Sequence, residues 1–151
     1  MNSLAHIGHV VSDVEVSVRF YTELFGFTTD RELSFEPEHL QDLLQLDPPS
    51  NMRAVYLLLG GFTLELMQYD PESRETAGSR VFNQTGLTHI SLVVDDPAEI
   101  MGRVADFGGT IVSDIGIAFV IRDPDGQLIE LLPPSYNDGI EEQRRAQHGK
   151  G

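Results

Sequence analysis

The apolar and polar positions of the chain follow a pattern that occurs twice. Residues 6–13 (HIGHVVSD) align with residues 89–96 (HISLVVDD), with His, Ile, Val, Val and Asp at the same offsets. In both copies the aspartate lies seven residues after the histidine. An internal repeat of this kind predicts that the chain is built from two copies of one structural unit.

A helical pattern follows each copy of the repeat. Ser12 and Glu15 form a predicted capping box before the first helix, and Asp96 is the predicted N-cap of the second. Apolar residues then recur at helical spacing on one face of each segment. We expect the first helix to end at Gly26 and the second at the glycine pair 108–109.

Short β-type runs separated by turns come after each helix. The predicted strands are residues 27–35, 52–59 and 62–69 in the first copy, and 110–113, 117–122 and 127–132 in the second. A Gly-Gly pair at 60–61 and the sequence DPDG at 123–126 predict the hairpin turns. Each copy therefore reads β-α-β-β-β, and the predicted fold class is α+β with two tandem modules.

The predicted domain organisation is a single domain over residues 1–136. Module one covers about 4–70, module two covers about 87–134, and the polar residues 137–151 are expected to form a mobile tail.

Module one is longer than module two in one place. From the helix-ending glycine to the final glutamate there are 39 residues in module one and 21 in module two. We place the excess between Glu36 and Asn51, where residues 37–44 predict a short helix in a position suited to covering a pocket.

Four residues at repeated positions are candidate metal ligands. His6 and His89 lie in the first predicted strand of each module, and Glu65 and Glu130 lie in the last, each four residues after a glycine. Neutral imidazoles and carboxylates bind divalent metals, and two of each leave coordination positions for water or substrate. Both glutamates have apolar neighbours, where an unpaired charge is costly to bury. A compensating metal ion is the favoured interpretation, and Glu–Arg ion pairs are the alternative.

The remaining histidines compete weakly for this role. Strand alternation places His9 on the opposite face from His6, so we expect it to face the core. His39 lies in the insertion, where a surface position is favoured over a contact with substrate. His148 lies in the polar tail and is assigned no role.

Composition narrows the classes of partner. The chain has 24 acidic and 10 basic residues and a formal net charge of −14, which argues against a nucleic-acid partner. It contains no cysteine, which excludes disulfides, thiolate ligands and cysteine nucleophiles. No signal peptide or membrane-length apolar run is apparent, so we expect a cytoplasmic protein without a membrane partner.

The motifs at both ends of the repeat resemble the vicinal oxygen chelate superfamily. Residues 6–13 with 20–27 (FYTELFGF) resemble its opening motif, and 123–130 (DPDGQLIE) resemble its closing motif. This superfamily includes glyoxalase I, methylmalonyl-CoA epimerase, extradiol dioxygenases, and fosfomycin and bleomycin resistance proteins. The resemblance covers about residues 4–134 and implies two modules that form a cupped mixed sheet around a metal site.

The resemblance also implies the ligand set and a branch of the superfamily. It places ligands at His6, Glu65, His89 and Glu130. Dioxygenase-like members use two His and one Glu, whereas glyoxalase-like and epimerase-like members carry a fourth ligand at the position of Glu65. Bleomycin-binding members lack the ligands. Retention of both glutamates therefore favours the glyoxalase I or epimerase-like branch.

The expected reaction in this branch is metal-dependent isomerisation, epimerisation or lyase chemistry. A small-molecule substrate chelates a divalent ion (Zn, Ni, Co, Mn or Fe) through its oxygens, and a base removes a proton next to the substrate carbonyl to form a metal-chelated enediolate. Glu130 is the favoured base, Glu65 is the second candidate, and Glu36 is a further alternative. A ring-cleaving dioxygenase and a drug-binding resistance protein are the alternative functions.

Substrate and assembly stay open at this point. The segment LMQYD after Glu65 does not resemble the segment that contributes to glutathione binding in glyoxalase I, so the substrate is not named. We expect a homodimer, because a small two-module protein leaves sheet edges and apolar surface to cover. The site is either contained in one chain or shared across the dimer.

Overall fold

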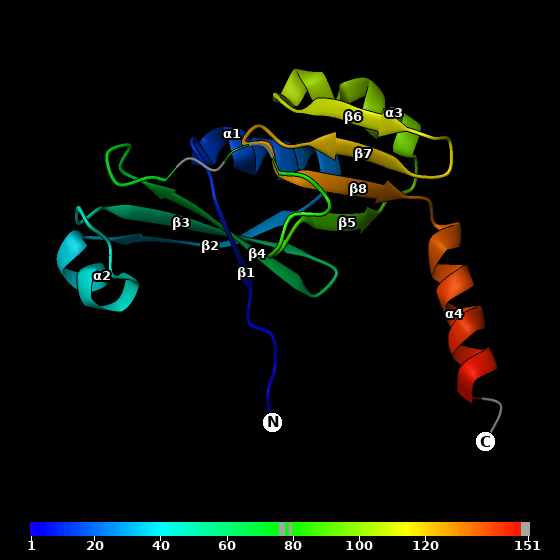
Figure 1. The fold of residues 1–151 in the computed structure, drawn as a ribbon, viewed down its shortest axis with the longest axis horizontal. Helices are drawn as coiled ribbons and strands as arrows, with labels where there is room; N and C mark the ends of the chain where they lie inside the picture. The colour runs from blue at the N-terminus through cyan, green and yellow to red at the C-terminus, as the bar shows by residue number, and fades with distance from the viewer. Residues whose placement is uncertain (76–77, 79, 149–151) are drawn as a thin grey trace. The chain divides into compact units, whose positions relative to one another are not determined.

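The computed structural model describes residues 1–75, 78 and 80–148, which form two compact units. Unit 1 is residues 1–78 and unit 2 is residues 79–151. Each unit contains one of the predicted modules, and each is described by itself below (Figure 1).

Unit 1 has the predicted β-α-β-β-β order with the predicted insertion. Its sheet has the strand order β1-β4-β3-β2, in which β1 and β4 are parallel and the other pairs are antiparallel. Its elements are β1 (Ile7–Val10), α1 (Val14–Arg19), the π-helical turn η1 (Phe20–Leu24), β2 (Thr28–Phe35), α2 (Pro37–Leu44), β3 (Met52–Leu59) and β4 (Phe62–Tyr69).

Helix α1 and the turn η1 cover one face of this sheet. Leu64 and Leu66 of β4 are fully buried, as is Tyr21 of η1. His9 is half-buried on the same face as Leu66, its partner in the parallel pairing, and its ring lies 6.5 Å from that of Tyr21. The prediction that His9 faces the core is therefore confirmed.

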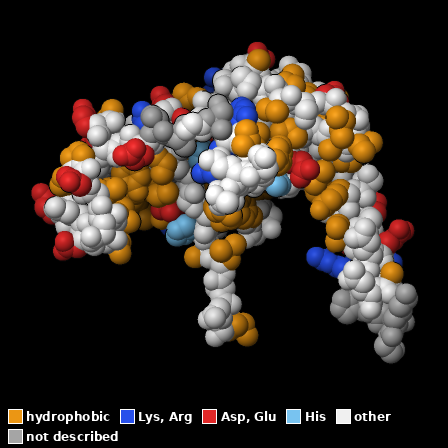
Figure 2. All heavy atoms as spheres, viewed as in Figure 1, with side chains coloured by type: hydrophobic (Ala, Val, Ile, Leu, Met, Phe, Trp, Pro, Cys, Tyr) orange, Lys and Arg blue, Asp and Glu red, His pale blue; other side chains and the backbone are white. Residues whose placement is uncertain are grey.

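The insertion helix α2 covers part of the opposite face. Its Leu40 is buried with Met52, Ala54 and Tyr56 of β3. Tyr56 pairs with Glu65 across the β3–β4 ladder, so α2 packs on the side of the sheet that carries the candidate ligand. Figure 2 shows acidic side chains gathered around this end of unit 1, in keeping with the negative charge of the chain.

Unit 2 repeats the topology of unit 1 without the insertion. Its sheet has the order β5-β8-β7-β6, with β5 and β8 parallel. Its elements are β5 (His89–Val93), α3 (Pro97–Arg103), the 3₁₀ turn η2 (Val104–Phe107), β6 (Thr110–Asp114), β7 (Phe119–Arg122), β8 (Leu128–Leu132) and α4 (Ser135–His148). The equivalent strand orders confirm the α+β fold built from tandem modules.

The polar segment at the end of the chain is helical in the structure. Helix α4 runs from Ser135 to His148, while residues 149–151 of the predicted tail lie outside the described residues. The mobility of this segment stays a prediction. Within the described part of the chain, no helix combines the length and apolar character needed to span a membrane.

Glycines stand at the turns that require a positive φ. Gly26 and Gly108 follow the two helical segments with φ values of 75° and 83°. Gly60 and Gly61, between β3 and β4, both have positive φ, as the tightest hairpin turn requires. The predicted ends of the helices and the predicted hairpin are therefore confirmed.

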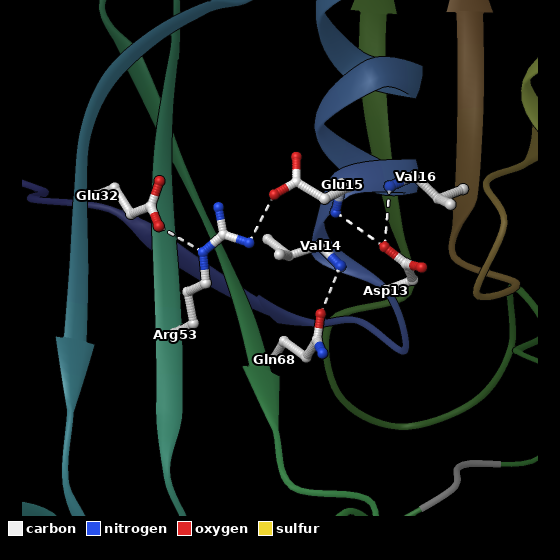
Figure 3. Close-up of polar contacts among 7 residues, drawn as sticks. All are labelled: Asp13, Val14, Glu15, Val16, Glu32, Arg53 and Gln68. Atoms are coloured by element: carbon white, nitrogen blue, oxygen red, sulfur yellow. Dashed lines mark hydrogen bonds and ion pairs between the residues drawn. The ribbon is translucent and has the colours of Figure 1, made fainter.

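The N-cap of α1 is Asp13, and the predicted Ser12–Glu15 capping box is wrong. Asp13 Oδ1 accepts hydrogen bonds from the backbone N–H groups of Glu15 and Val16, at 3.0 and 3.2 Å (Figure 3). The Gln68 side chain accepts a third, from Val14, at 2.8 Å. A carboxylate at this end of a helix also interacts favourably with the helix dipole.

Arg53 of β3 connects α1 to the sheet. Its guanidinium lies 2.6 Å from Oε1 of Glu15 on α1 and also donates a hydrogen bond to Glu32 on β2 (Figure 3). The hydrogen bond from Arg53 lowers the pKa of Glu32. The helix is thus held at its N-terminus by Asp13 and Gln68 and at its first turn by Arg53.

Replacing Asp13 tests the assignment of this cap. Asp13→Ala should lower the free energy of unfolding by about 1 kcal/mol, because two backbone N–H groups lose their acceptor. Ser12→Ala is the matched control and should cost less. Urea denaturation of both variants measures the free energy of unfolding. A larger loss of this free energy in Ser12→Ala than in Asp13→Ala would support the Ser12–Glu15 capping box instead.

Candidate metal centre

The first His–Glu pair lies in unit 1, on the face opposite α1. His6, just before β1, places its Nε2 atom 3.0 Å from Oε2 of Glu65 in β4. The parallel pairing of β1 with β4 sets Gly8 opposite Glu65. A Cβ at Gly8 would lie 2.7 Å from the Met67 methyl carbon, so glycine leaves room for that side chain, whereas Glu65 Oε2 at 3.7 Å would be at an ordinary contact distance.

Tyr56 completes the surroundings of Glu65. Its hydroxyl donates a 2.5 Å hydrogen bond to Oε1, the oxygen that does not face His6. Its ring also meets the His6 ring edge to face at 5.6 Å. Burial, with the hydrogen bond to Glu65 adding to it, raises the pKa of Tyr56. Glu65 is only 7% exposed, so both of its oxygens are committed inside the protein.

The second His–Glu pair lies in unit 2 and is more open. His89 Nε2 is 3.9 Å from Glu130 Oε2, and the side chains are 35% and 29% exposed. Ser91, opposite Glu130 in the β5–β8 pairing, donates a hydrogen bond to Glu130 Oε2. Thr88 Oγ1 lies 2.8 Å from His89 Nδ1, so a hydrogen bond there engages Nδ1 and leaves Nε2, which lies 3.9 Å from Glu130, available to a ligand.

The chemistry of both pairs fits a divalent metal. His6 Nε2 and Glu65 Oε2 lie 3.0 Å apart, and His89 Nε2 and Glu130 Oε2 lie 3.9 Å apart, so each pair brings together one nitrogen and one oxygen of the kinds that bind divalent ions. Neither glutamate forms an ion pair with an arginine among the described residues, so the alternative of Glu–Arg pairs is not supported. Within residues 1–75, 78 and 80–148, no group of three or more His, Asp or Glu side chains is placed to hold an ion. Each pair supplies half of the predicted ligand set.

The other predicted site residues lie apart from these pairs. His39 is exposed on α2, and Glu36 is the exposed N-cap of that helix. His9 faces Tyr21 on the far side of the sheet. The side chain of His148 lies outside the described residues.

Sequence reasoning missed the hydroxyl groups that contact the two glutamates. The pairing of Tyr56 with Glu65 could have been predicted from the hairpin. A two-residue turn at Gly60-Gly61 pairs Leu59 with Phe62, and counting outward from that pair places residue 56 opposite Glu65. Ser91 is harder to find, because its contact with Glu130 depends on the parallel register of strands distant in sequence.

Comparison with known protein families identifies a match over most of the chain. The model of the Glyoxalase/Bleomycin resistance protein/Dioxygenase superfamily matches residues 3–131. The lactoylglutathione lyase of Escherichia coli O157:H7 is 28% identical over 145 residues, covering 85% of this chain and 90% of the relative.

Solved structures share the fold. A glyoxalase I of Leishmania major, described as trypanothione-dependent, has a TM-score of 0.69 at 22% identity over the whole of both chains. The fosfomycin resistance protein FosX of Listeria monocytogenes, solved with Mn(II) and sulfate, has a TM-score of 0.58 at 19% identity and covers 87% of this chain and 91% of that one.

Replacing Glu65 by glutamine separates a structural role from a ligand role. In the presence of a chelator, Glu65→Gln should change the free energy of unfolding by less than about 1 kcal/mol, because the amide oxygen still accepts the Tyr56 bond and a buried charge is removed. Urea denaturation measures this change. A loss of about 3 kcal/mol or more would instead identify His6–Glu65 as a structural ion pair.

Proposed function

The chain belongs to the Glyoxalase/Bleomycin resistance protein/Dioxygenase superfamily and is an enzyme of it, and from this premise we propose that it removes a proton next to a carbonyl group. The reaction is a metal-dependent lyase, isomerase or epimerase reaction on a small molecule. The observation that carries the proposal is the repeated imidazole–carboxylate pair, His6 with Glu65 and His89 with Glu130.

These four residues are the proposed ligands of one divalent ion. Two neutral imidazoles and two carboxylates balance its charge and leave positions for substrate oxygens. The bound ion would polarise the substrate carbonyl and stabilise the negative charge that develops as the proton leaves. Zn, Ni, Co, Mn and Fe all accept this donor set. The two pairs meet either within one chain or across two copies of it.

Glu130 is the proposed base. Its side chain is about three times as exposed as that of Glu65, 29% against 9%. Among the described residues, Ser91 donates a hydrogen bond to one oxygen of Glu130 and His89 lies 3.9 Å from the same oxygen, whereas Tyr56 and His6 contact both oxygens of Glu65 at 2.5 and 3.0 Å. A carboxylate with this freedom can turn toward a substrate carbon and accept its proton, a contribution of about 10² to 10⁴ in rate.

The proposed substrate class is a 2-hydroxyacyl thioester or a related oxo compound. The E. coli relative is named lactoylglutathione lyase. In S-lactoylglutathione the acidic C–H lies between a hydroxyl and a thioester carbonyl, so two neighbouring oxygens can reach one ion. Because the segment 66–70 differs from the expected glutathione-binding segment, glutathione itself is not required by the proposal.

A homodimer and a cytoplasmic location complete the proposal. Strand β6 is an edge strand of its sheet, and its Ile111 and Val112 are exposed. Apolar side chains on an unpaired edge favour association with a second copy.

Hydrogen exchange at the substrate carbon tests this function directly. Protein stripped with a chelator and then reloaded with each candidate metal is incubated with S-lactoylglutathione in D₂O. NMR follows loss of the C2 proton signal. We expect exchange only in the reloaded protein. Glu130→Gln should lower the exchange rate at least about 100-fold, because the amide cannot accept the proton, while its amide oxygen still binds the metal.

The remaining outcomes define what would overturn the proposal. The same exchange assay with S-lactoyl-N-acetylcysteamine, which lacks the glutathione moiety, shows whether the enzyme recognises the acyl thioester alone. Absence of exchange with both thioesters and every metal would contradict proton abstraction from this substrate class. Oxygen uptake with a catechol and ferrous iron would select a ring-cleaving dioxygenase. Retained exchange in Glu130→Gln would show that another residue is the base.

A further inference from the structure

We propose that Tyr56 is a positioning residue that holds Glu65 as a fixed metal ligand. This inference rests on the proposed metal site and assigns a role to a residue outside the four ligands. Tyr56 touches both members of the unit 1 pair, through its hydroxyl to Glu65 and through its ring to His6.

The hydrogen bond selects which oxygen of Glu65 is available. Tyr56 lies directly opposite Glu65 in the antiparallel ladder of β3 and β4. Its hydroxyl donates to Oε1 at 2.5 Å, and Oε2 is then left facing His6 at 3.0 Å. Rotation of the carboxylate would break this bond inside a buried site, which is costly. Tyr56 therefore presents one carboxylate oxygen beside the imidazole.

The ring of Tyr56 is itself held on several sides. Tyr56 belongs to the same buried cluster as Leu40 of the insertion helix α2. The Arg31 guanidinium lies 3.8 Å from the ring centroid, and the His6 ring is nearly perpendicular to the Tyr56 ring, with centroids 5.6 Å apart. Tyr56 is 7% exposed. The insertion thus supports the metal ligand through Tyr56, although α2 supplies no ligand.

The two units use different strands to hold their carboxylates. In unit 2 the residue opposite Glu130 on the antiparallel side is Val120, which has no donor, and Ser91 on the parallel side provides the hydrogen bond. In unit 1 the residue equivalent to Ser91 is Gly8, and Tyr56 provides the bond instead. The buried phenol restrains Glu65, while the short serine hydroxyl leaves Glu130 accessible.

Metal affinity tests the role of Tyr56 independently of turnover. Tyr56→Phe keeps the ring and its packing but removes the donor, and it should weaken Zn²⁺ binding about 10- to 100-fold, the usual effect of removing a partner behind a metal ligand. Tyr69→Phe is the matched control: it makes the same change on the same face of the sheet, but the Tyr69 hydroxyl contacts Met67 sulfur at 3.7 Å and interacts with Glu65 only through its charge. Titration calorimetry measures both, on the metal-free protein after the chelator has been removed.

A spectroscopic signature of the unmodified protein provides a second readout. The chain has four tyrosines and no tryptophan, and Zn²⁺ has no absorption of its own from d electrons. Zn²⁺ binding should therefore change the near-UV tyrosine spectrum of the wild type, because the Tyr56 hydroxyl bonds to a ligand oxygen. Tyr69→Phe should keep this change, and Tyr56→Phe should lose it.

The outcomes separate this proposal from the proposed function. Unaltered Zn²⁺ affinity in Tyr56→Phe, or an equal loss in Tyr69→Phe, would overturn the role of Tyr56. If Tyr56→Phe fails to fold, an unchanged tyrosine spectrum on Zn²⁺ binding to the wild type overturns it equally. Absence of proton exchange from every substrate tested, with these Zn²⁺ effects intact, would reject the reaction and leave Tyr56 as the residue that positions Glu65.

Discussion

Burial of the Glu65 carboxylate in an apolar strand is the constraint on which the rest of the site depends. Its neighbours Leu64 and Leu66 are fully buried, so strand alternation places Glu65 on the opposite face, where it is only 7% exposed. A buried carboxylate requires compensation. The structure provides it through the Tyr56 hydroxyl and the His6 imidazole. A metal ion at Oε2 would complete this compensation.

Repetition of one module has produced two pairs with different surroundings. Both units have the same strand order and place a histidine beside a glutamate. The unit 1 glutamate is buried, and its tyrosine partner belongs to the same buried cluster as Leu40 of the insertion helix. The unit 2 glutamate is more exposed and held by a serine. This difference gives a physical basis for assigning a fixed ligand to one unit and a movable base to the other.

Strong local signals made much of this structure predictable from the sequence. The strands around Gly60-Gly61 and the helix at 37–44 have their predicted bounds because turn glycines and prolines mark their ends. The predicted N-terminal cap of α1 is wrong because Ser12 and Asp13 are adjacent and both are residue types that favour the N-cap position. The paired offsets predicted His6, Glu65, His89 and Glu130 as one ligand set, and the structure brings His6 close to Glu65 and His89 near Glu130. The donors Tyr56 and Ser91 were not predicted, and the Ser91 contact depends on parallel register, which local sequence does not encode.

The central claim is that two half-sites serve one metal ion, and the stoichiometry of Zn²⁺ binding tests it most directly. Calorimetry and elemental analysis are applied to the wild type, His6→Ala and His89→Ala. A shared site predicts that about one ion binds per chain. It also predicts that either substitution weakens the binding of that ion, although the two histidines belong to different units. Two ions per chain, with each variant losing one and retaining the other unchanged, would contradict the account.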